Sequence, residues 1–213
     1  LCVHAIGDRA NRVALDMLER MIEMDPANTS LQQFRPALQY WHGDKAAALA
    51  GWSEIAEGRG SLPMISGGYG LFAHLRYIWL LQQSGRGGAA QAEIAKIDGD
   101  LAARAGTSTA SYPDRKWERG LLAFLQGNRE DALTWFSAAI DDGYYDLDDF
   151  DDPMLAPLAG QDEFEALRQR VRDILAAERD KALVMICTEN PVPDHWQPLA
   201  ETCAEVAPAR GQG

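Results

Sequence analysis

Three evenly spaced glycines constrain the fold of this chain more than any other feature. Gly43, Gly85 and Gly127 are 42 residues apart, and each stands between two stretches with helix-like apolar spacing. A glycine at such a point allows the positive φ angle of a tight helix-to-helix turn at low steric cost. A repeat of this period predicts stacked pairs of helices rather than a mixed sheet.

A second pattern follows each glycine at a fixed distance. A small residue is followed four places later by a bulky one and three places after that by an apolar or small one. Steps of four and three place such residues on one helical face. We therefore expect the small residue where two helix backbones approach and the bulky one in the groove beside it. The three sets are Ala48, Trp52, Ile55; Ala90, Ile94, Ile97; and Ala132, Phe136, Ala139.

The same set occurs near the start as Ala14, Leu18 and Met21, followed by "MDPAN", in which Pro26 stops the helix. Gly7-Asp8 then takes the turn position, with two extra residues before the set. Pro36 would interrupt a helix unless the helix begins there. The segments 58–70 and 105–114, rich in Gly, Ser, Thr and Pro, are predicted connections.

These residues resemble the tetratricopeptide repeat, in which a Gly-Asp or Gly-Asn turn joins two helices. "GDKAAALAGW" and "GNREDALTWF" match well, "GRGGAAQAEI" matches loosely, and "GDRANRVALDML" matches with an insertion. The resemblance implies an all-α solenoid of three to four helix pairs over residues 1–145. The period exceeds the usual one of that family by about eight residues, which predicts longer helices or loops.

The sequence changes character after the last repeat. Seven aspartates lie between Asp141 and Asp152, and no register among them supplies the glycine and glutamate of a calcium-binding hand. We expect a solvated acidic loop, with a weak cation site or an Arg-rich partner as the alternatives. Residues 146–185 are predicted to form this loop and a helix that caps the solenoid. The capping face contains Phe164, Leu167, Val171, Ile174 and Leu175.

The final segment, residues 186–213, is predicted to be an irregular, proline-rich tail. Cys187 and Cys203 flank three of its prolines. In the periplasm these cysteines could form a disulfide, and in the cytoplasm they would be free thiols. The sequence leaves the compartment open.

Residues 120–203 resemble the C-terminal ends of long bacterial signalling proteins. In those proteins, tetratricopeptide-type repeats follow an adenylate-cyclase domain or a DNA-binding winged-helix domain, sometimes with a membrane span between them. The chain begins with Leu1 rather than Met, so we expect it to belong to a longer protein. The resemblance implies a protein-binding or scaffold module without catalysis or cofactor.

An alternative starts from "VHAIGDRAN", residues 3–11, which resembles a motif of metal-dependent amidohydrolases. Under it, His4 would bind the metal and Asp8 would belong to the same site. The resemblance also requires an upstream His-x-His, a later histidine in a segment like Ile-Glu-His-Ala-Gln, and an aspartate at the end of a late strand. His42, His74 and His195 do not follow the β-branched runs that such strands need, so the hydrolase remains the second interpretation.

Charge and hydropathy exclude two classes of partner. The 20 basic and 32 acidic residues give a net charge of −12, which repels phosphate backbones, so we expect no nucleic-acid partner. No apolar run is long enough to span a bilayer, so this chain is not expected to insert into a membrane.

In tetratricopeptide solenoids the first helices line a concave groove that takes a peptide or a partner helix. The resemblance places aromatic and amide side chains there, and two arginines suit the acidic end of a partner. The other interpretation of the aromatic residues is packing between repeats. A passive spacer is a third possible function. The predicted partner-binding residues are Tyr40, Trp41, Arg76, Trp79, Gln82, Gln83, Trp117 and Arg119.

Overall fold

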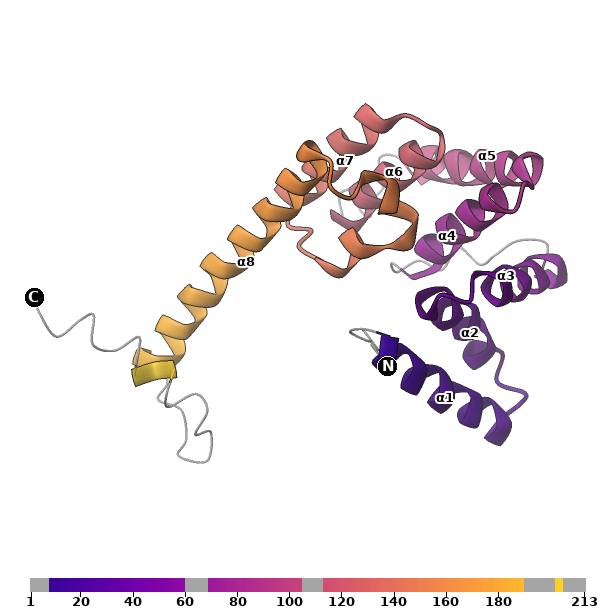
Figure 1. Ribbon diagram of the computed structural model, residues 1–213, viewed down its shortest axis with the longest axis horizontal. Coiled ribbons are helices and arrows are strands. Elements are labelled where there is room, and N and C mark those ends of the chain that lie inside the picture. The colour runs from indigo at the N-terminus through magenta and orange to yellow at the C-terminus, as the bar shows by residue number, and fades with distance from the viewer. Residues whose placement is uncertain (1–7, 60–68, 105–112, 190–201, 205–213) are drawn as a thin grey trace, which may run out of the picture. The chain divides into compact units, whose positions relative to one another are not determined.

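The computed structural model describes residues 8–59, 69–104, 113–189 and 202–204 (Figure 1). In these ranges the secondary structure is helical, with no strand, which confirms the all-α prediction. The chain divides into two compact units, Leu1–Tyr144 and Tyr145–Gly213. Each unit is described by itself below.

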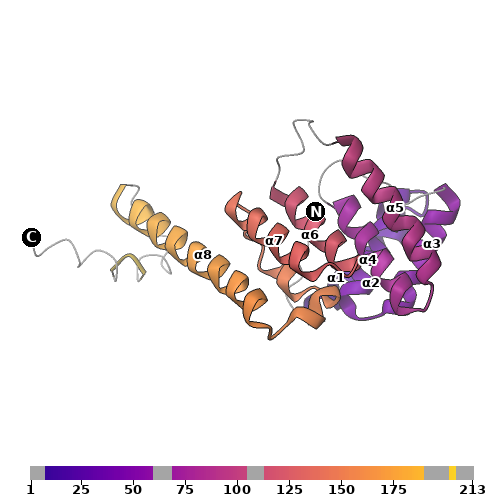
Figure 2. The ribbon, with the colours of Figure 1, turned by 90° about the horizontal axis from the view of Figure 1, so that it is seen from above.

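The first unit contains seven α-helices in the described ranges. Three antiparallel pairs, α2 with α3, α4 with α5 and α6 with α7, are joined by short turns (Figures 1 and 2). In addition, α1 packs on α2, α3 on α4, and α4 on α6. The helices are α1 (Asp8–Met24), α2 (Thr29–His42), α3 (Lys45–Arg59), α4 (Tyr69–Gln83), α5 (Gly87–Arg104), α6 (Pro113–Leu125) and α7 (Arg129–Asp141).

The three turns have the same main-chain geometry. Gly43, Gly85 and Gly127 have φ angles of 91°, 76° and 83°. The amide after each glycine donates to the carbonyl five residues earlier, which satisfies a carbonyl at the end of the first helix. The 42-residue spacing is thus a repeat of backbone structure. These bonds run from Asp44 to Gln39 (2.9 Å), Arg86 to Leu81 (2.8 Å) and Asn128 to Ala123 (2.9 Å).

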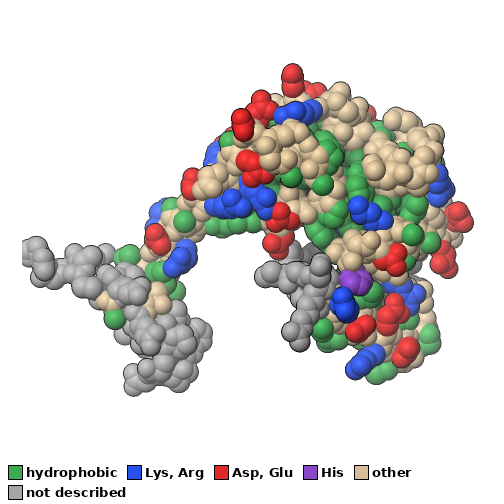
Figure 3. All heavy atoms as spheres, viewed as in Figure 1, with side chains coloured by type: hydrophobic (Ala, Val, Ile, Leu, Met, Phe, Trp, Pro, Cys, Tyr) green, Lys and Arg blue, Asp and Glu red, His purple; other side chains and the backbone are tan. Residues whose placement is uncertain are grey.

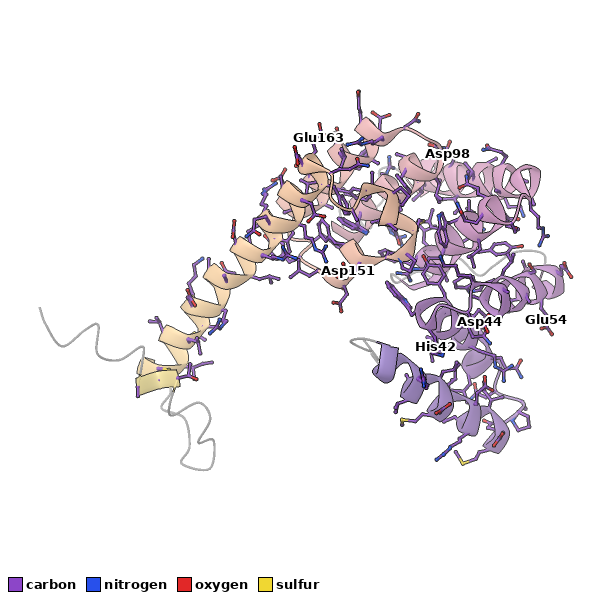
Figure 4. The ribbon with its side chains drawn as sticks, viewed as in Figure 1. His42, Asp44, Glu54, Asp98, Asp151 and Glu163 are labelled. Carbon is purple, nitrogen blue, oxygen red and sulfur yellow. A yellow bond between two sulfur atoms is a disulfide. The ribbon has the colours of Figure 1, made fainter. Side chains whose placement is uncertain are left out.

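The second helix of each pair starts in the same way. The amide of the repeat alanine donates to the carbonyl of the residue after the turn glycine, at 3.0 Å for Ala48, 3.1 Å for Ala90 and 3.0 Å for Ala132. Asp44, labelled in Figure 4, adds a side-chain cap, since its Oδ1 accepts from the Ala47 amide at 3.0 Å. Turn and cap therefore fix where each second helix begins.

All but one of the predicted packing positions in the three helix pairs are buried. Ala48, Ala90 and Ala132 have no exposed surface, and the bulky residues Trp52, Ile94 and Phe136 are buried too, as are Ile97 and Ala139. Ile55 is half-buried. Small residues at the crossings let the paired helices approach, as expected.

The prediction at Pro36 was wrong, because α2 runs straight through it. The helix begins at Thr29, after Asn28, whose side chain accepts from the Leu31 amide. A Cβ added to Gly51 of α3 would lie 2.7 Å from Cγ of Pro36. The missing side chain of Gly51 therefore makes room for the proline ring between α2 and α3.

The first helix, α1, ends at Met24, before Pro26, as predicted. Ala14 and Leu18 are buried, whereas Met21 is half-buried. Arg35 of α2 forms a two-pronged ion pair with Glu19, at 2.7 and 2.6 Å, which joins α1 to α2. Gly7 lies outside the described residues.

The second unit contains the 3₁₀ turns η1 (Asp148–Asp151) and η2 (Pro153–Leu158) and the long helix α8 (Asp162–Glu189). Phe150 packs on Phe164 with ring centroids 5.3 Å apart. Phe164 and Val171 are fully buried, while Leu175 is partly exposed. The helix continues four residues past the predicted end at 185. Its role as a cap of the helical pairs stays a prediction.

The acidic stretch contains two 3₁₀ turns in which carboxylates accept hydrogen bonds and pair with a cation. Asp152 is buried, and its carboxylate accepts from the Met154 amide at 2.8 Å, which caps η2. Asp151 pairs with Arg168 of α8, and Asp146 accepts from the Asp148 amide at 3.0 Å. Local side-chain to backbone bonds therefore hold this segment in turns.

Cys187 and Cys203 form a disulfide, with their Cα atoms 5.3 Å apart. The bond ties the end of α8 to the helical residues 202–204. Of the two alternatives left open by the sequence, the structure has the bridge.

Candidate partner-binding surface

Aromatic side chains from three helices gather around Tyr40. Its ring centroid lies 5.7 Å from Trp41, 5.8 Å from Trp52 and 5.9 Å from Trp79. We call these four residues the aromatic cluster. The edge-on and tilted ring arrangements are those that aromatic pairs prefer. The cluster joins α2 and α3 to α4.

Two cations cover the rings of this cluster. The guanidinium carbon of Arg76 lies 4.7 Å from the Trp41 ring and 5.6 Å from the Tyr40 ring, and only 8% of the arginine is exposed. Nζ of Lys45 lies 4.6 Å from the Trp79 ring. Ring faces attract cations and compensate for part of the solvation that a buried arginine loses. Arg76 therefore packs against aromatic rings of this chain and has little surface left for a partner.

The predicted site residues on α6 differ in exposure. Trp117 is fully buried, with its ring centroid 4.3 Å from Phe136 and 4.9 Å from Tyr144. Arg119 is half-buried, and its guanidinium carbon lies 5.2 Å from the Trp135 ring. The arginine thus keeps exposed surface, and the tryptophan keeps none.

The two predicted glutamines of α4 also differ. Gln82 donates to the Leu125 carbonyl at the end of α6, at 2.9 Å, and so links two first helices. Gln83 is exposed. The last carbonyls of an α-helix have no hydrogen-bond donor within the helix. Gln82 donates to one of them, so this glutamine has a structural role.

Burial divides the predicted binding residues into two groups. Tyr40 and Trp117 have no exposed surface, and Trp79 has little. For these residues the burial supports packing between helices, so we leave them and Arg76 out of the proposed surface. The residues that retain exposure are Trp41, Gln82, Gln83 and Arg119.

A cluster of charged side chains around the buried His74 lies between α4 and α5, and no sequence pattern predicted it. Nε2 of His74 lies 2.7 Å from one carboxylate oxygen of Glu93, and Nζ of Lys96 lies 2.6 Å from the other. Burial raises the pKa of Glu93, but the hydrogen bonds and charges of Lys96 and His74 outweigh it and hold the pKa below the ordinary value. His74 and Glu93 are on separate helices, so no local pattern predicts their pairing.

Glu118 is a buried acid on α6. It has no exposed surface, and it accepts from Arg115 on the same helix at 2.7 Å. The three-residue spacing of Arg115 and Glu118 is a local pattern from which this ion pair could have been predicted. The His74–Glu93 pair joins α4 to α5, whereas the Arg115–Glu118 pair lies within α6.

His4 of the amidohydrolase alternative lies outside the described residues, and Asp8 is the first residue of α1. Among the described residues, His, Cys, Asp and Glu side chains form no group of three or more that could hold a metal ion. In that same part of the chain, no helix combines the length and apolar character needed to cross a membrane.

Comparison with protein-family models, with curated proteins and with solved structures returns no match. The resemblance to tetratricopeptide repeats therefore rests on the residues and turns described above.

Proposed function

We propose that this chain is a tetratricopeptide-like scaffold module of a larger bacterial signalling protein, and that it binds a protein or peptide partner. The main support is the recurrence of one turn geometry and one packing set at intervals of 42 residues. Repeated helix pairs of this kind present an extended surface on which a partner can lie. Catalysis, a cofactor and nucleic acid have no part in the proposal.

The exposed predicted residues suggest the chemistry of the partner. Trp41 retains part of its exposure and supplies apolar area. The half-buried Arg119 lies over Trp135 and supplies a cation, and Gln83 adds an exposed amide. An acidic segment with apolar side chains suits this combination.

The test is affinity capture from a bacterial lysate with the whole chain as bait. A Trp41→Ala, Arg119→Glu double variant is expected to lose the specific partner, because these changes remove a partly exposed aromatic side chain and reverse a partly exposed charge. Arg172→Glu reverses an exposed charge on α8 and serves as the matched control. Circular dichroism checks that all three proteins keep their helices.

The outcome separates a binding module from a spacer. If wild type, double variant and control capture the same proteins, the proposed surface is wrong. If none captures a specific protein, the spacer is favoured. Such a spacer would hold other domains of the parent protein at a set distance.

A further inference from the structure

The first helix carries an exposed apolar stripe. The exposed fractions are 51% for Val13, 56% for Met17 and 79% for Met24. Steps of four and seven place these residues on one face of α1. Figure 3 shows hydrophobic side chains among charged ones on the surface of α1, and Figure 4 shows sulfur-bearing side chains projecting from it. The buried face of the same helix contains Ala14, Leu18 and Ile22.

In the other repeats, the position equivalent to Met17 lies against a neighbouring helix. Met17 stands three residues after Ala14, and the residues three places after the other repeat alanines are Gly51, Glu93 and Trp135. Each of these three meets the first helix of its own pair. Gly51 lies against Pro36, Glu93 bonds to His74, and Trp135 lies under Arg119. The face of α1 that contains Met17 is therefore suited to an antiparallel helix.

The charges beside the stripe indicate which helix. Arg12, Asp16, Arg20 and Glu23 are all exposed, and their spacing puts them along one flank of the stripe. Their charges alternate along α1 as plus, minus, plus, minus. In the opposite chain direction the order is minus, plus, minus, plus.

This order makes α1 complementary to itself in the antiparallel direction. When two helices pack antiparallel with their stripes in contact, the same flank of each faces the other. Arg12 then lies opposite Glu23 of the second copy, and Asp16 lies opposite Arg20 of the second copy. Two-fold symmetry repeats both pairs. A parallel arrangement would put the charged flanks on opposite sides and gain neither pair.

We propose that α1 is a self-association site, where a second copy of this chain docks antiparallel through Val13, Met17 and Met24. The ion pairs set direction and register, and the burial of the apolar stripe drives association. One pair of short helices buries less surface than a standard interface. The dimer is therefore reversible and depends on concentration. This inference does not depend on whether the chain binds another partner.

The first test is sedimentation of the whole chain over a range of concentrations. Wild type is expected to pass from monomer to dimer, and Met17→Glu is expected to weaken the dimer about tenfold or more. Met185→Glu is the matched control, because this methionine is 54% exposed on α8. A chain that stays monomeric overturns the proposal. So does a dimer that Met17→Glu leaves intact or that Met185→Glu weakens as much.

The second test swaps charges to probe the direction. Asp16→Arg and Arg20→Asp, each alone, place like charges opposite one another and are expected to weaken the homodimer. Mixing the two variants restores opposite charges at both places and is expected to give a heterodimer. If the mixture associates no better than each variant alone, the antiparallel arrangement is wrong. Unchanged helicity in circular dichroism shows that each variant is folded.

Discussion

Gly120 of α6 lies directly against the ring of Phe136 in α7. A Cβ atom at Gly120 would lie 2.5 Å from two ring carbons and 3.1 Å from the Ala132 carbonyl oxygen. Neither distance leaves room for a methyl group. The close approach of these two helices therefore depends on the absence of a side chain at this position.

Gly120→Ala is expected to destabilise the chain, although alanine favours helix by about 1 kcal/mol over glycine. The clash with Phe136 costs about 1–3 kcal/mol, since a closely packed site has little room to relax. Urea unfolding measures the difference. The control is Gly99→Ala on α5, where an added Cβ meets nothing within 4 Å. That variant is expected to be slightly more stable, and equal losses in both variants would contradict the steric explanation.

Replacing any one of the turn glycines by alanine is expected to cost about 1–2 kcal/mol, because a side chain disfavours the left-handed backbone. Gly43→Ala, Gly85→Ala and Gly127→Ala should behave alike, since their φ angles and hydrogen bonds agree. Asparagine at the same places should cost less, as it tolerates that region better. Thermal unfolding of the six variants checks the order. If the three alanine variants are as stable as the wild type, the positive φ angles of these turns do not require glycine.

Glu93→Gln is expected to lower stability at neutral pH by about 1 kcal/mol, because it removes the charge bonded to Lys96 and His74. The pKa of Glu93 is lower in the folded chain than the ordinary 4.5. Its contribution is therefore fully present above 4.5 and is lost as the pH falls through the folded value. Wild type and variant should converge in acid, as measured by melting temperature against pH.

The control for this prediction is Glu54→Gln, an exposed residue of α3 labelled in Figure 4. It should leave the melting temperature nearly unchanged at every pH. A gap between wild type and Glu93→Gln that stays constant down to acid pH would mean that the ionised carboxylate is not the cause.

Reduction of the Cys187–Cys203 bridge is expected to loosen the end of α8 without unfolding the first unit. Closing a loop of this size is worth about 3 kcal/mol in the chain-entropy model, and that restraint acts on the second unit. Hydrogen exchange of the amides near Cys187 should rise on reduction, while exchange in α6 and α7 should not. Trypsin releases both cysteines in one peptide, residues 182–210, whose mass before and after reduction tells whether the bridge is present.

Local sequence patterns predicted those parts of the fold that depend on single residues. A turn with positive φ needs glycine, so Gly43, Gly85 and Gly127 marked the three turns. A helix crossing needs a small side chain, so Ala48, Ala90 and Ala132 marked the contacts. Both requirements are steric and local. The glycines and alanines that meet them can therefore be recognised in the sequence without knowing which helices are in contact.

The exposure of the predicted binding residues could not be predicted in this way. Tryptophan and tyrosine suit both a binding groove and a core, so only the packing of α2, α3 and α4 showed that Tyr40 is enclosed. Pro36 fits against α3 because Gly51, distant in the sequence, has no side chain at that point.

The sequence by itself therefore determined the helical pairs and their period, since these follow from backbone sterics within a few residues. Only the tertiary structure decided which aromatic side chains are buried, which charges pair across helices, and that the apolar stripe of α1 stays exposed. The reason is physical: burial and ion pairing depend on neighbours that are distant in the chain, and no local pattern contains them.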